Sequence, residues 1–429
     1  MSVVGGELEI AIIGGGAAGL ATAYLLDARH RVTLFEREAI LGGNIRTLGR
    51  NVACPQLPAG VHLDAGVIEF SPEHFPRFHR LMDQLGVETR PVPVSTGLIR
   101  RTGAPLRALG KITGPGLRPR ERLSALLELL RHAPEFIRFR RRARRAAADP
   151  EGLYRRDLDS LLERGPISEW MRLLIVYAYS IPRARVGETP AALAIPTLLR
   201  FTGPVSWTCV PGGVYRYVER LLARLRGRVI TGARVRSVRR DARGVELTVE
   251  ADHDARARLG VDAGGRRRFD RVVLATTPGQ LTELLADPSD DERRRLAPWR
   301  DRELVTIVHD DLGMYARRGL RDYSEFDLFE ETGGYNAHLG RLCALDPARA
   351  GYSLSFAMEP ELDPARILHR QPHRTPRYSV AALATRRELL AHSGARHTFL
   401  AGAWLGDGLH EGAIESAARI SATLGGRAL

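Results

Sequence analysis

Lysine is almost absent from this chain of 429 residues, and cysteine is scarce. Lys111 is the single lysine, so nearly all of the 64 basic residues are arginine. Cys54, Cys209 and Cys343 stand far apart in the sequence, which excludes a disulfide framework and offers no metal-ligand spacing. We therefore expect no metal site, and we expect a reducing compartment, the cytoplasm.

Long apolar runs are missing too. The chain has no stretch of about 20 apolar residues, the length that a membrane-spanning helix needs. Its first residues, Met1 to Glu9, contain acids and no basic segment, which argues against a signal peptide. Shares of 44% hydrophobic and 27% charged residues exclude a disordered or collagenous protein and are ordinary for a globular one.

The formal net charge of +14 is high. A basic chain can attract nucleic acid, anionic lipid or an acidic substrate. A GC-rich coding sequence, which raises arginine, alanine and glycine together, is the alternative explanation. Because no nucleic-acid-binding motif accompanies the arginines, we expect no nucleic-acid partner.

The chain begins with the pattern of a β-α-β unit. An apolar strand is predicted over Leu8 to Ile13, an Ala/Leu-rich helix over Ala17 to Leu26, and a second strand over Arg31 to Glu36. This order, within about 30 residues, is typical of the first unit of a doubly wound fold.

The turn between the first strand and the helix reads Gly-Gly-Gly-Ala-Ala-Gly. Gly14 permits a tight turn, Gly16 lets the backbone approach a pyrophosphate, and Gly19 lets the helix pack closely on the strand. Glu36, at the end of the second strand, can accept hydrogen bonds from both ribose hydroxyls of an adenosine, and its charge disfavours the 2′-phosphate of NADP. Together these features predict a dinucleotide site.

Six further segments follow in order: Leu41 to Arg46 (Leu-Gly-Gly-Asn-Ile-Arg), Asp64 to Gly66, Trp207 to Leu221, Ala233 to Val235, Val272 to Thr276, and Phe399 to Ser421. With the glycine turn, they resemble the flavin-containing amine oxidase and phytoene desaturase superfamily. The branch of predicted NAD/FAD-binding proteins is the most similar. The resemblance is collinear along nearly the whole chain, and its helical middle matches poorly.

The resemblance implies that the cofactor is FAD, bound non-covalently. In this family the last glycine turn leads into a helix whose N-terminal amides face the flavin pyrimidine, and a positive helix end there stabilises reduced flavin. The residues placed at the cofactor by the resemblance and by the glycine turn are Gly14, Gly16, Ala17, Ala18, Gly19, Glu36, Arg37, Gly43, Asn44, Arg46, Gly66, Val67, Val235, Ala275, Gly402, Gly412, Ala413 and Ile414.

The resemblance also implies an α/β fold class: a Rossmann-type FAD-binding domain, GR2-like, with an inserted α+β substrate domain of mixed sheet and helices. We expect the FAD-binding domain over 1–90, 226–300 and 396–429, and the substrate domain over 91–225 and 301–395. Its Arg-rich segment 115–200 reads as helical, with breaks expected at Pro134, Pro150, Pro166, Pro182 and Pro196.

Three departures from the amine oxidases of this superfamily concern the substrate. Those enzymes commonly hold a lysine near flavin N5, and Lys111 lies in a segment that does not match that position. One member of their aromatic cage corresponds to Leu409, and an acidic residue corresponds to Ala403. Because an amine benefits from π faces and from a group that handles its proton, we expect instead an apolar, acyl- or isoprenoid-like substrate that loses hydride to flavin N5.

The activity would then be that of a desaturase, a dehydrogenase or a double-bond isomerase, with oxygen, a quinone or a protein as electron acceptor. A flavin amine oxidase and a flavin-bound partner protein without turnover are the alternatives. The candidate catalytic residues are His410, as a hydrogen-bond donor to flavin or a base, and Trp404, against the flavin or the substrate. A packing role is the alternative for both residues. For Tyr177 and Tyr179 we consider two roles: they line a substrate tunnel, or they belong to the core.

Residues 118–145 combine an apolar stripe with a run of arginines. Leu123, Leu126, Leu127 and Leu130 recur at helical spacing, and after Pro134 apolar residues are interleaved with arginines. Such a helix can lie on anionic lipid or receive an acidic, phosphate-bearing carrier, and a solvated surface helix is the third possibility. We therefore expect a cytoplasmic protein, with peripheral membrane contact as an open alternative.

Overall fold

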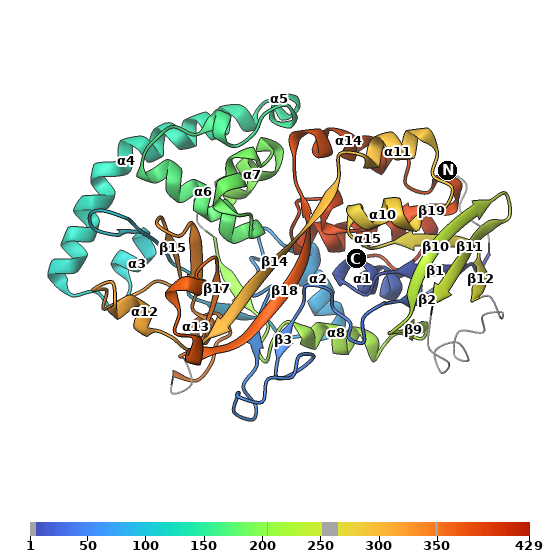
Figure 1. The fold of residues 1–429 in the computed structure, drawn as a ribbon, viewed down its shortest axis with the longest axis horizontal. Coiled ribbons are helices and arrows are strands. Elements are labelled where there is room, and N and C mark those ends of the chain that lie inside the picture. The colour runs from blue at the N-terminus through green and yellow to red at the C-terminus, as the bar shows by residue number, and fades with distance from the viewer. Residues whose placement is uncertain (1–5, 204, 251–264, 348–350) are drawn as a thin grey trace.

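The computed structural model describes residues 6–203, 205–250, 265–347 and 351–429. A five-stranded parallel sheet lies in the right-hand half of the molecule as drawn in Figure 1. The strand order is β19-β13-β1-β2-β9, and every neighbouring pair is parallel. The strands are β1 (Glu9–Ile13), β2 (Arg31–Phe35), β9 (Arg228–Ile230), β13 (Arg271–Leu274) and β19 (Thr398–Leu400). Both ends and the middle of the chain therefore meet in one sheet, and the predicted first β-α-β unit is confirmed.

The two faces of this sheet are covered differently because side chains alternate along each strand. Ile10 and Ile12 of β1 pack on the helical face, whereas Ala11 and Ile13 point to the opposite core. The helical face is covered by α1 (Ala17–Leu26), α2 (Pro76–Leu85), α8 (Tyr215–Leu222) and α15 (His410–Leu424). Helix α8, expected in the substrate domain, packs in this core instead, because its apolar side chains face α1 and α2.

An antiparallel sheet of three strands covers the other face. It consists of β10 (Arg234–Asp241), β11 (Gly244–Glu250) and β12 (Arg266–Phe269). The sequence predicts a loop or hairpin tip over 251–268; residues 251–264 lie outside the described part, and for residues 266–268 the prediction is wrong. Those arginines form β12 because their backbone pairs with Leu247 and its neighbours on β11.

A mixed sheet of seven strands forms the second half of the molecule, in the order β18-β14-β17-β16-β15-β6-β7. It contains β6 (Thr96–Ile99), β7 (Leu106–Arg107), β14 (Arg300–His309), β15 (Phe326–Phe329), β16 (Gly334–Ala337), β17 (Ser353–Phe356) and β18 (Ile367–Arg377). The sequence predicts strands over Leu304 to His309 and Tyr352 to Met358 in a sheet of their own. The structure confirms this, because β14 pairs with β17.

Helices cover this sheet on the outer side of the molecule (Figure 1). They are α3 (Leu109–Thr113), α4 (Pro119–Ala147), α5 (Pro150–Tyr154), α6 (Pro166–Tyr179) and α7 (Ala191–Phe201). The breaks expected at Pro134 and Pro196 are wrong: each proline lies inside a continuous helix, and buried residues on both sides hold the helix together. The breaks expected at Pro150 and Pro166 are confirmed: each proline is the first residue of a new helix, where no N–H partner is lost.

The remaining regular elements are short and connect these layers. They are β3 (Thr47–Leu48), β4 (Leu63–Asp64), β5 (Arg90–Val92), β8 (Trp207–Cys209), α10 (Pro278–Leu284), α11 (Asp290–Leu296), α12 (Gly313–Ala316), α13 (Leu339–Leu342), α14 (Val380–Ala391) and the 3₁₀ turn η7 (Ala403–Leu405). None of the helices in the described part is both long and apolar enough to cross a bilayer.

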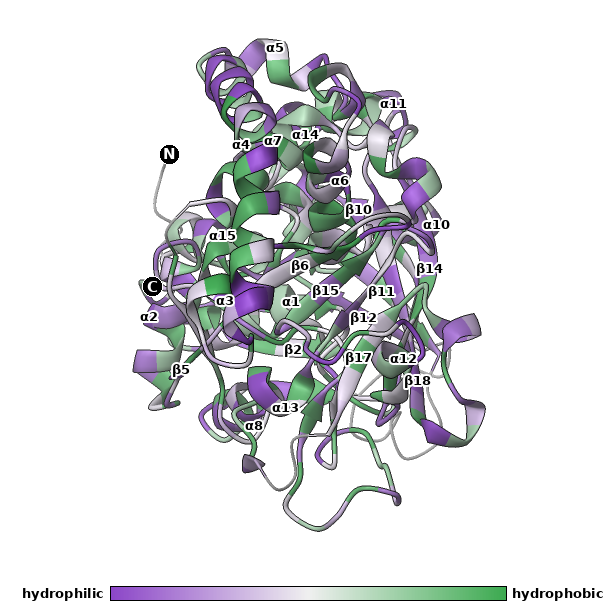
Figure 2. Cartoon of the chain, turned by 90° about the vertical axis from the view of Figure 1, so that its left-hand side faces the viewer, coloured by the Kyte–Doolittle hydropathy of each residue, from purple (hydrophilic) through white to green (hydrophobic). Residues whose placement is uncertain are grey.

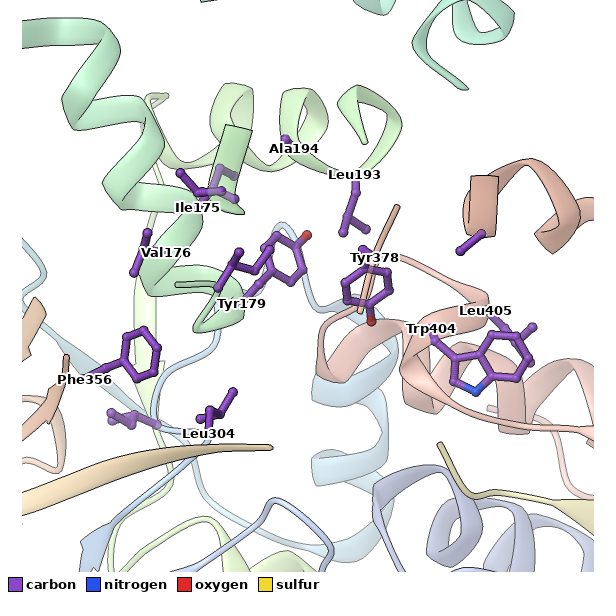
Figure 3. Close-up of a cluster of buried hydrophobic side chains, with 14 of the residues drawn as sticks. Ile175, Val176, Tyr179, Leu193, Ala194, Leu304, Phe356, Tyr378, Trp404 and Leu405 are labelled. Carbon is purple, nitrogen blue, oxygen red and sulfur yellow. The ribbon is translucent and has the colours of Figure 1, made fainter. Parts of the chain in front are cut away.

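A continuous apolar core joins the two halves. Tyr179, at the end of α6, and Tyr378 lie edge to face, with ring centroids 5.9 Å apart (Figure 3). Trp404 belongs to the same core and packs on Trp299 at 4.9 Å. The half of the molecule that contains the seven-stranded sheet is therefore packed directly against the loop that precedes α15.

Candidate functional site

A cavity of about 970 Å³ lies where the five-stranded sheet faces the seven-stranded sheet and its helices. Its walls come from the first glycine turn, the ends of β2 and β13, strand β10, the last residues of α6 and α7, strands β14 and β18, and the loop before α15. Segments from both ends of the chain thus face the same cleft.

At Gly14 and Gly19 of the glycine turn, the surrounding backbone leaves no room for a side chain. Gly14 has φ +111°, and a Cβ atom there would lie 2.7 Å from the carbonyl oxygen of Ala275. A Cβ atom on Gly19 would lie 1.9 Å from the carbonyl oxygen of Gly14. Gly19 is absent from the cavity lining and serves to let α1 pack against the turn.

The first turn of α1 presents free backbone donors to the cavity. Its N-cap is Gly16, no side chain caps the helix, and the first turn holds no acid. The amides of Ala17 and Ala18 therefore carry the positive end of the helix dipole toward the cavity that these residues line. Gly43 approaches from the second glycine pair, and a Cβ atom there would lie 3.0 Å from the Cα atom of Gly16.

Glu36 lies beside this turn at the end of β2. One carboxylate oxygen accepts a hydrogen bond from the amide of Gly15 at 2.7 Å, and the other accepts one from the amide of Glu38 at 2.9 Å. These two bonds fix the orientation of the carboxylate at the cavity wall, which Val235 of β10 also lines. Its remaining lone pairs are the acceptors that ribose hydroxyls need.

Arg46 brings a positive charge to the same wall. Its Nη1 donates to the carbonyl oxygen of Leu41 at 3.0 Å, and burial lowers the pKa of its guanidinium. An arginine side chain nevertheless stays protonated in proteins, so the charge is available to a phosphate. The neighbouring Arg37 also lines the cavity, with its Nε 3.0 Å from Glu38.

The N-terminal end of α15 is capped by Asp407. Its Oδ1 accepts hydrogen bonds from the amides of Leu409 and Gly412, each at 2.9 Å. The amide of Gly412 is therefore already engaged, and neither Gly412 nor the fully buried Ile414 lines the cavity. Of the three positions expected to face the flavin, Ala413 is the one that reaches the cavity wall.

His410 is buried in an aromatic cluster. Its Nε2 lies 3.0 Å from the hydroxyl of Tyr217, and its ring meets Phe70 and Phe78 edge on at 5.4 and 5.3 Å. Burial lowers the pKa of His410 to about 4, so the imidazole is neutral at neutral pH. It borders the cavity, and this environment favours the packing role over that of a base.

Trp404 also borders the cavity while remaining 2% exposed. Its ring lies on Gly402, where a Cβ atom would come within 2.5 Å of Nε1. The indole N–H has no hydrogen-bond partner among the described residues, and neither has the buried hydroxyl of Thr276 on the same wall. Two buried donors without a partner on one cavity wall are consistent with a polar ligand.

Most of the residues predicted to contact the cofactor line this cavity. They are Gly14, Gly16, Ala17, Ala18, Glu36, Arg37, Gly43, Asn44, Arg46, Gly66, Val67, Val235, Ala275, Gly402 and Ala413. A helix N-terminus, a carboxylate with free lone pairs and a half-buried arginine along one cleft fit an adenine dinucleotide.

At the other end of the cavity the walls are aromatic and aliphatic. Tyr177 stacks on Phe326 at 4.3 Å between ring centroids and meets Tyr335 edge on at 5.0 Å. The tunnel role proposed for Tyr177 and Tyr179 agrees with their position, because both border the cavity while they also belong to the core. The apolar residues around them are Ile68, Phe201, Trp207, Leu304, Leu354 and Leu409.

Sequence reasoning missed Glu69, which faces these aromatic walls. Its carboxylate accepts a hydrogen bond from the hydroxyl of Tyr177. Burial raises the pKa of Glu69 to about 7 and, with the charge of Glu69, holds the pKa of Tyr177 well above its usual value. The hydroxyl of Tyr177 therefore keeps its proton at neutral pH and can donate it in the hydrogen bond, whereas the carboxyl group of Glu69 gains or loses its proton near neutral pH. Glu69 follows the Asp-Ala-Gly segment by three residues, the one signal that the sequence offered.

Thr306 and His373 are two further cavity residues that the sequence did not indicate. The hydroxyl of Thr306 donates to the carbonyl of Ala65 at 2.7 Å, and His373 Nε2 lies 3.0 Å from the same oxygen. Burial lowers the pKa of His373 to about 4, so it is neutral at neutral pH. They position the segment before Gly66, and no local pattern could reveal them because they come from β14 and β18.

Lys111 lies outside this cavity. It is buried in α3, where its Nζ is 2.9 Å from the carboxylate of Asp322. The cavity wall described here therefore contains no lysine.

Comparisons with known proteins agree with this architecture. A family model described as flavin containing amine oxidoreductase matches residues 17–309. The structure of a putrescine oxidase variant is 16% identical, with a TM-score of 0.67 over 98% of this chain and 99% of that one. A CLA-producing fatty acid isomerase from P. acnes is 16% identical, with a TM-score of 0.66 over 97% and 98% of the chains. Cyclohexylamine oxidase from Brevibacterium oxydans IH-35A is 17% identical, with a TM-score of 0.64 over 98% and 100%.

Proposed function

The chain belongs to the family of flavin-containing amine oxidoreductases, and from this premise we propose that it takes hydride from a C–H bond of an apolar, acyl- or isoprenoid-like substrate. It is an FAD-dependent oxidoreductase with a Rossmann-type FAD-binding fold. The substrate is the proposed part. The fold alone does not identify the substrate, because structures of the same fold include amine oxidases and a fatty acid isomerase.

The residues that would hold FAD are those of the polar half of the cavity. The amides of Ala17 and Ala18 and the guanidinium of Arg46 would bind the pyrophosphate, and Glu36 would bind the ribose of the adenosine. Bound FAD supplies a hydride acceptor at N5.

One observation carries the choice of substrate: the other half of the cavity is walled by aromatic and aliphatic side chains without a lysine. Tyr177, Tyr335 and Leu409 offer surface for a hydrocarbon chain and exclude water from it. Removal of hydride from such a substrate depends mainly on its position.

A desaturation must also dispose of a proton. When a saturated C–C unit loses a hydride from one carbon, the neighbouring carbon loses a proton, and a C=C bond forms. The carboxylate of Glu69 would accept that proton, because its pKa of about 7 permits both protonation states and Tyr177 keeps it oriented. An isomerase would return the hydride to another carbon of the same substrate.

Amine oxidation is the second candidate, and Glu69 is the observation that favours it. A carboxylate among tyrosine rings can attract an ammonium group and accept its proton. A polar amine would then be held by a charge, whereas a hydrocarbon would be held by the walls alone.

The test is anaerobic reduction of the FAD-loaded protein, followed by flavin absorbance and product analysis. The panel consists of unsaturated fatty acids, linear isoprenoids and simple alkyl- and diamines. Bleaching or double-bond migration with the first two classes and none with amines supports the proposal; the reverse result overturns it in favour of amine oxidation. A flavin whose redox state no compound changes supports the non-catalytic alternative.

A further inference from the structure

Helix α4 forms the outer edge of the molecule, away from the five-stranded sheet (Figure 1). Figure 2 faces the side of the molecule that carries α4 and colours the chain by hydropathy. The inner side of the helix is packed: Phe139 and Ala143 are buried, and the guanidinium of Arg140 donates to the carbonyl of Thr202 after α7. The outer side has no neighbour within the described chain that covers it.

Large aliphatic side chains follow one another on this outer side. Leu123, Leu127, Leu130 and Ile137 recur at intervals of three, four and seven residues, so they share one helix face over about 21 Å. With Leu109 of α3 they are between 49% and 59% exposed. Among the described residues, the other exposed large hydrophobic side chains stand elsewhere, at Ile40 and Val305. We call Leu123, Leu127, Leu130 and Ile137 of α4 the leucine stripe.

Arginines flank the leucine stripe and give it one sign of charge. The exposed arginines of α4 without a carboxylate of the described residues within 4.0 Å are Arg120, Arg131, Arg141, Arg144 and Arg145. Among the acids of α4, Glu121 is exposed and accepts from the backbone amide of Arg118, while Glu128 and Glu135 turn inward to Arg100 and to the amide of Ser168.

We propose that the outer side of α4, with the leucine stripe at its centre, docks on the surface of an anionic lipid bilayer. A solvated helix has no need of a row of half-exposed leucines, and a purely acidic partner would leave them uncovered. A bilayer surface satisfies both features, because the leucines enter the boundary of the acyl chains while the arginines reach the phosphates.

The position of α4 would place the substrate end of the cavity near the membrane. Helix α4 packs on α6 and α7, and the last turns of these helices carry Tyr177 and Phe201 to the cavity wall. The docking proposal rests on the surface of α4 and is independent of the substrate proposed above.

Vesicle flotation of the full, FAD-loaded chain tests the proposal. Two kinds of vesicle are compared: phosphatidylcholine alone, and phosphatidylcholine mixed with phosphatidylglycerol. We expect binding to the mixed vesicles alone, with a loss at about 1 M salt, where the Debye length falls to about 3 Å. The triple variant R131Q/R141Q/R145Q should lower the partition coefficient by roughly 100-fold, and L123Q/L127Q/L130Q by roughly tenfold or more.

A matched control removes the same charge from the far side of the molecule. R220Q/R239Q/R243Q changes exposed arginines on α8 and around β10, and its binding should equal that of the parent chain. The proposal is overturned if the control weakens binding as much as the α4 arginine variant, or if the parent chain does not float with the mixed vesicles. It is also overturned if the leucine variant binds normally, because the contact is then electrostatic only. Far-UV circular dichroism and FAD content verify that every variant is folded.

Discussion

At the scale of single residues, Glu69 is held at a cost to the folded state. Burial raises its pKa from 4.5 to about 7, so the folded protein binds a proton there more tightly than the unfolded chain does. By linkage, the free energy of unfolding falls as the pH rises from about 4.5 to about 7, and levels off above. We expect Glu69→Gln, which can still accept from Tyr177, to be more stable than the parent chain at pH 8 by on the order of 2 kcal/mol and near parity at pH 4.5.

Denaturant unfolding at several pH values measures this difference. Glu73 is the matched control, because the hydroxyl of Ser71 lowers its pKa to about 2 and its carboxylate stays ionised across the window. The difference between Glu73→Gln and the parent chain should therefore not change between pH 5 and 8. If the difference in the free energy of unfolding between Glu69→Gln and the parent chain is also independent of pH, the pKa of Glu69 is not raised in the folded protein.

At the scale of elements, two glycines of the turn before α1 have different roles: Gly19 is needed for folding, and Gly16 for binding of the ligand. A Cβ atom on Gly19 would lie 1.9 Å from the carbonyl oxygen of Gly14, whereas one on Gly16 finds its nearest neighbour at 3.8 Å. Gly19→Ala should destabilise the protein by about 3 kcal/mol or more. Gly16→Ala should fold normally and lose FAD, because its methyl group lies in the cleft where the backbone would meet the pyrophosphate.

Thermal unfolding of the FAD-free proteins and the flavin content after reconstitution distinguish the two effects. Equal losses of stability in both variants would contradict the geometry of the turn. Local patterns had different success in two helices. The Ala/Leu-rich segment after the glycine turn predicted the bounds of α1 correctly, whereas Pro134 predicted a break that α4 does not have. The difference lies in tertiary packing, because buried Phe139 and Ala143 hold α4 in a single helix beyond the proline.

At the scale of the whole molecule, the cofactor cleft is made by segments from the beginning, the middle and the end of the chain. A ligand that contacts all of them binds the folded state and not the unfolded chain. FAD at about 100 times its dissociation constant should therefore add about 2.7 kcal/mol to the free energy of unfolding. Differential scanning calorimetry of FAD-stripped protein checks this, with the midpoint expected to rise by a few degrees as FAD is added. A midpoint that does not respond to FAD would show that the cleft is not its site.

The local signals of the sequence predicted the first β-α-β unit and a dinucleotide site at Gly14 to Glu36, and the resemblance to a known family added FAD and the residues up to Arg46. They could do so because a glycine turn and a helix N-terminus are built from neighbours in the chain. The helical spacing of apolar residues and arginines over residues 118–145 also predicted an amphipathic, arginine-rich helix. Only the tertiary structure determined the contacts between distant segments. Glu69 accepts a hydrogen bond from Tyr177, Thr306 and His373 contact the carbonyl of Ala65, and His410 lies inside an aromatic cluster. These contacts depend on how the two sheets pack against each other. Burial shifts the pKa values of Glu69 and His410, and these side chains become buried only when the sheets have packed.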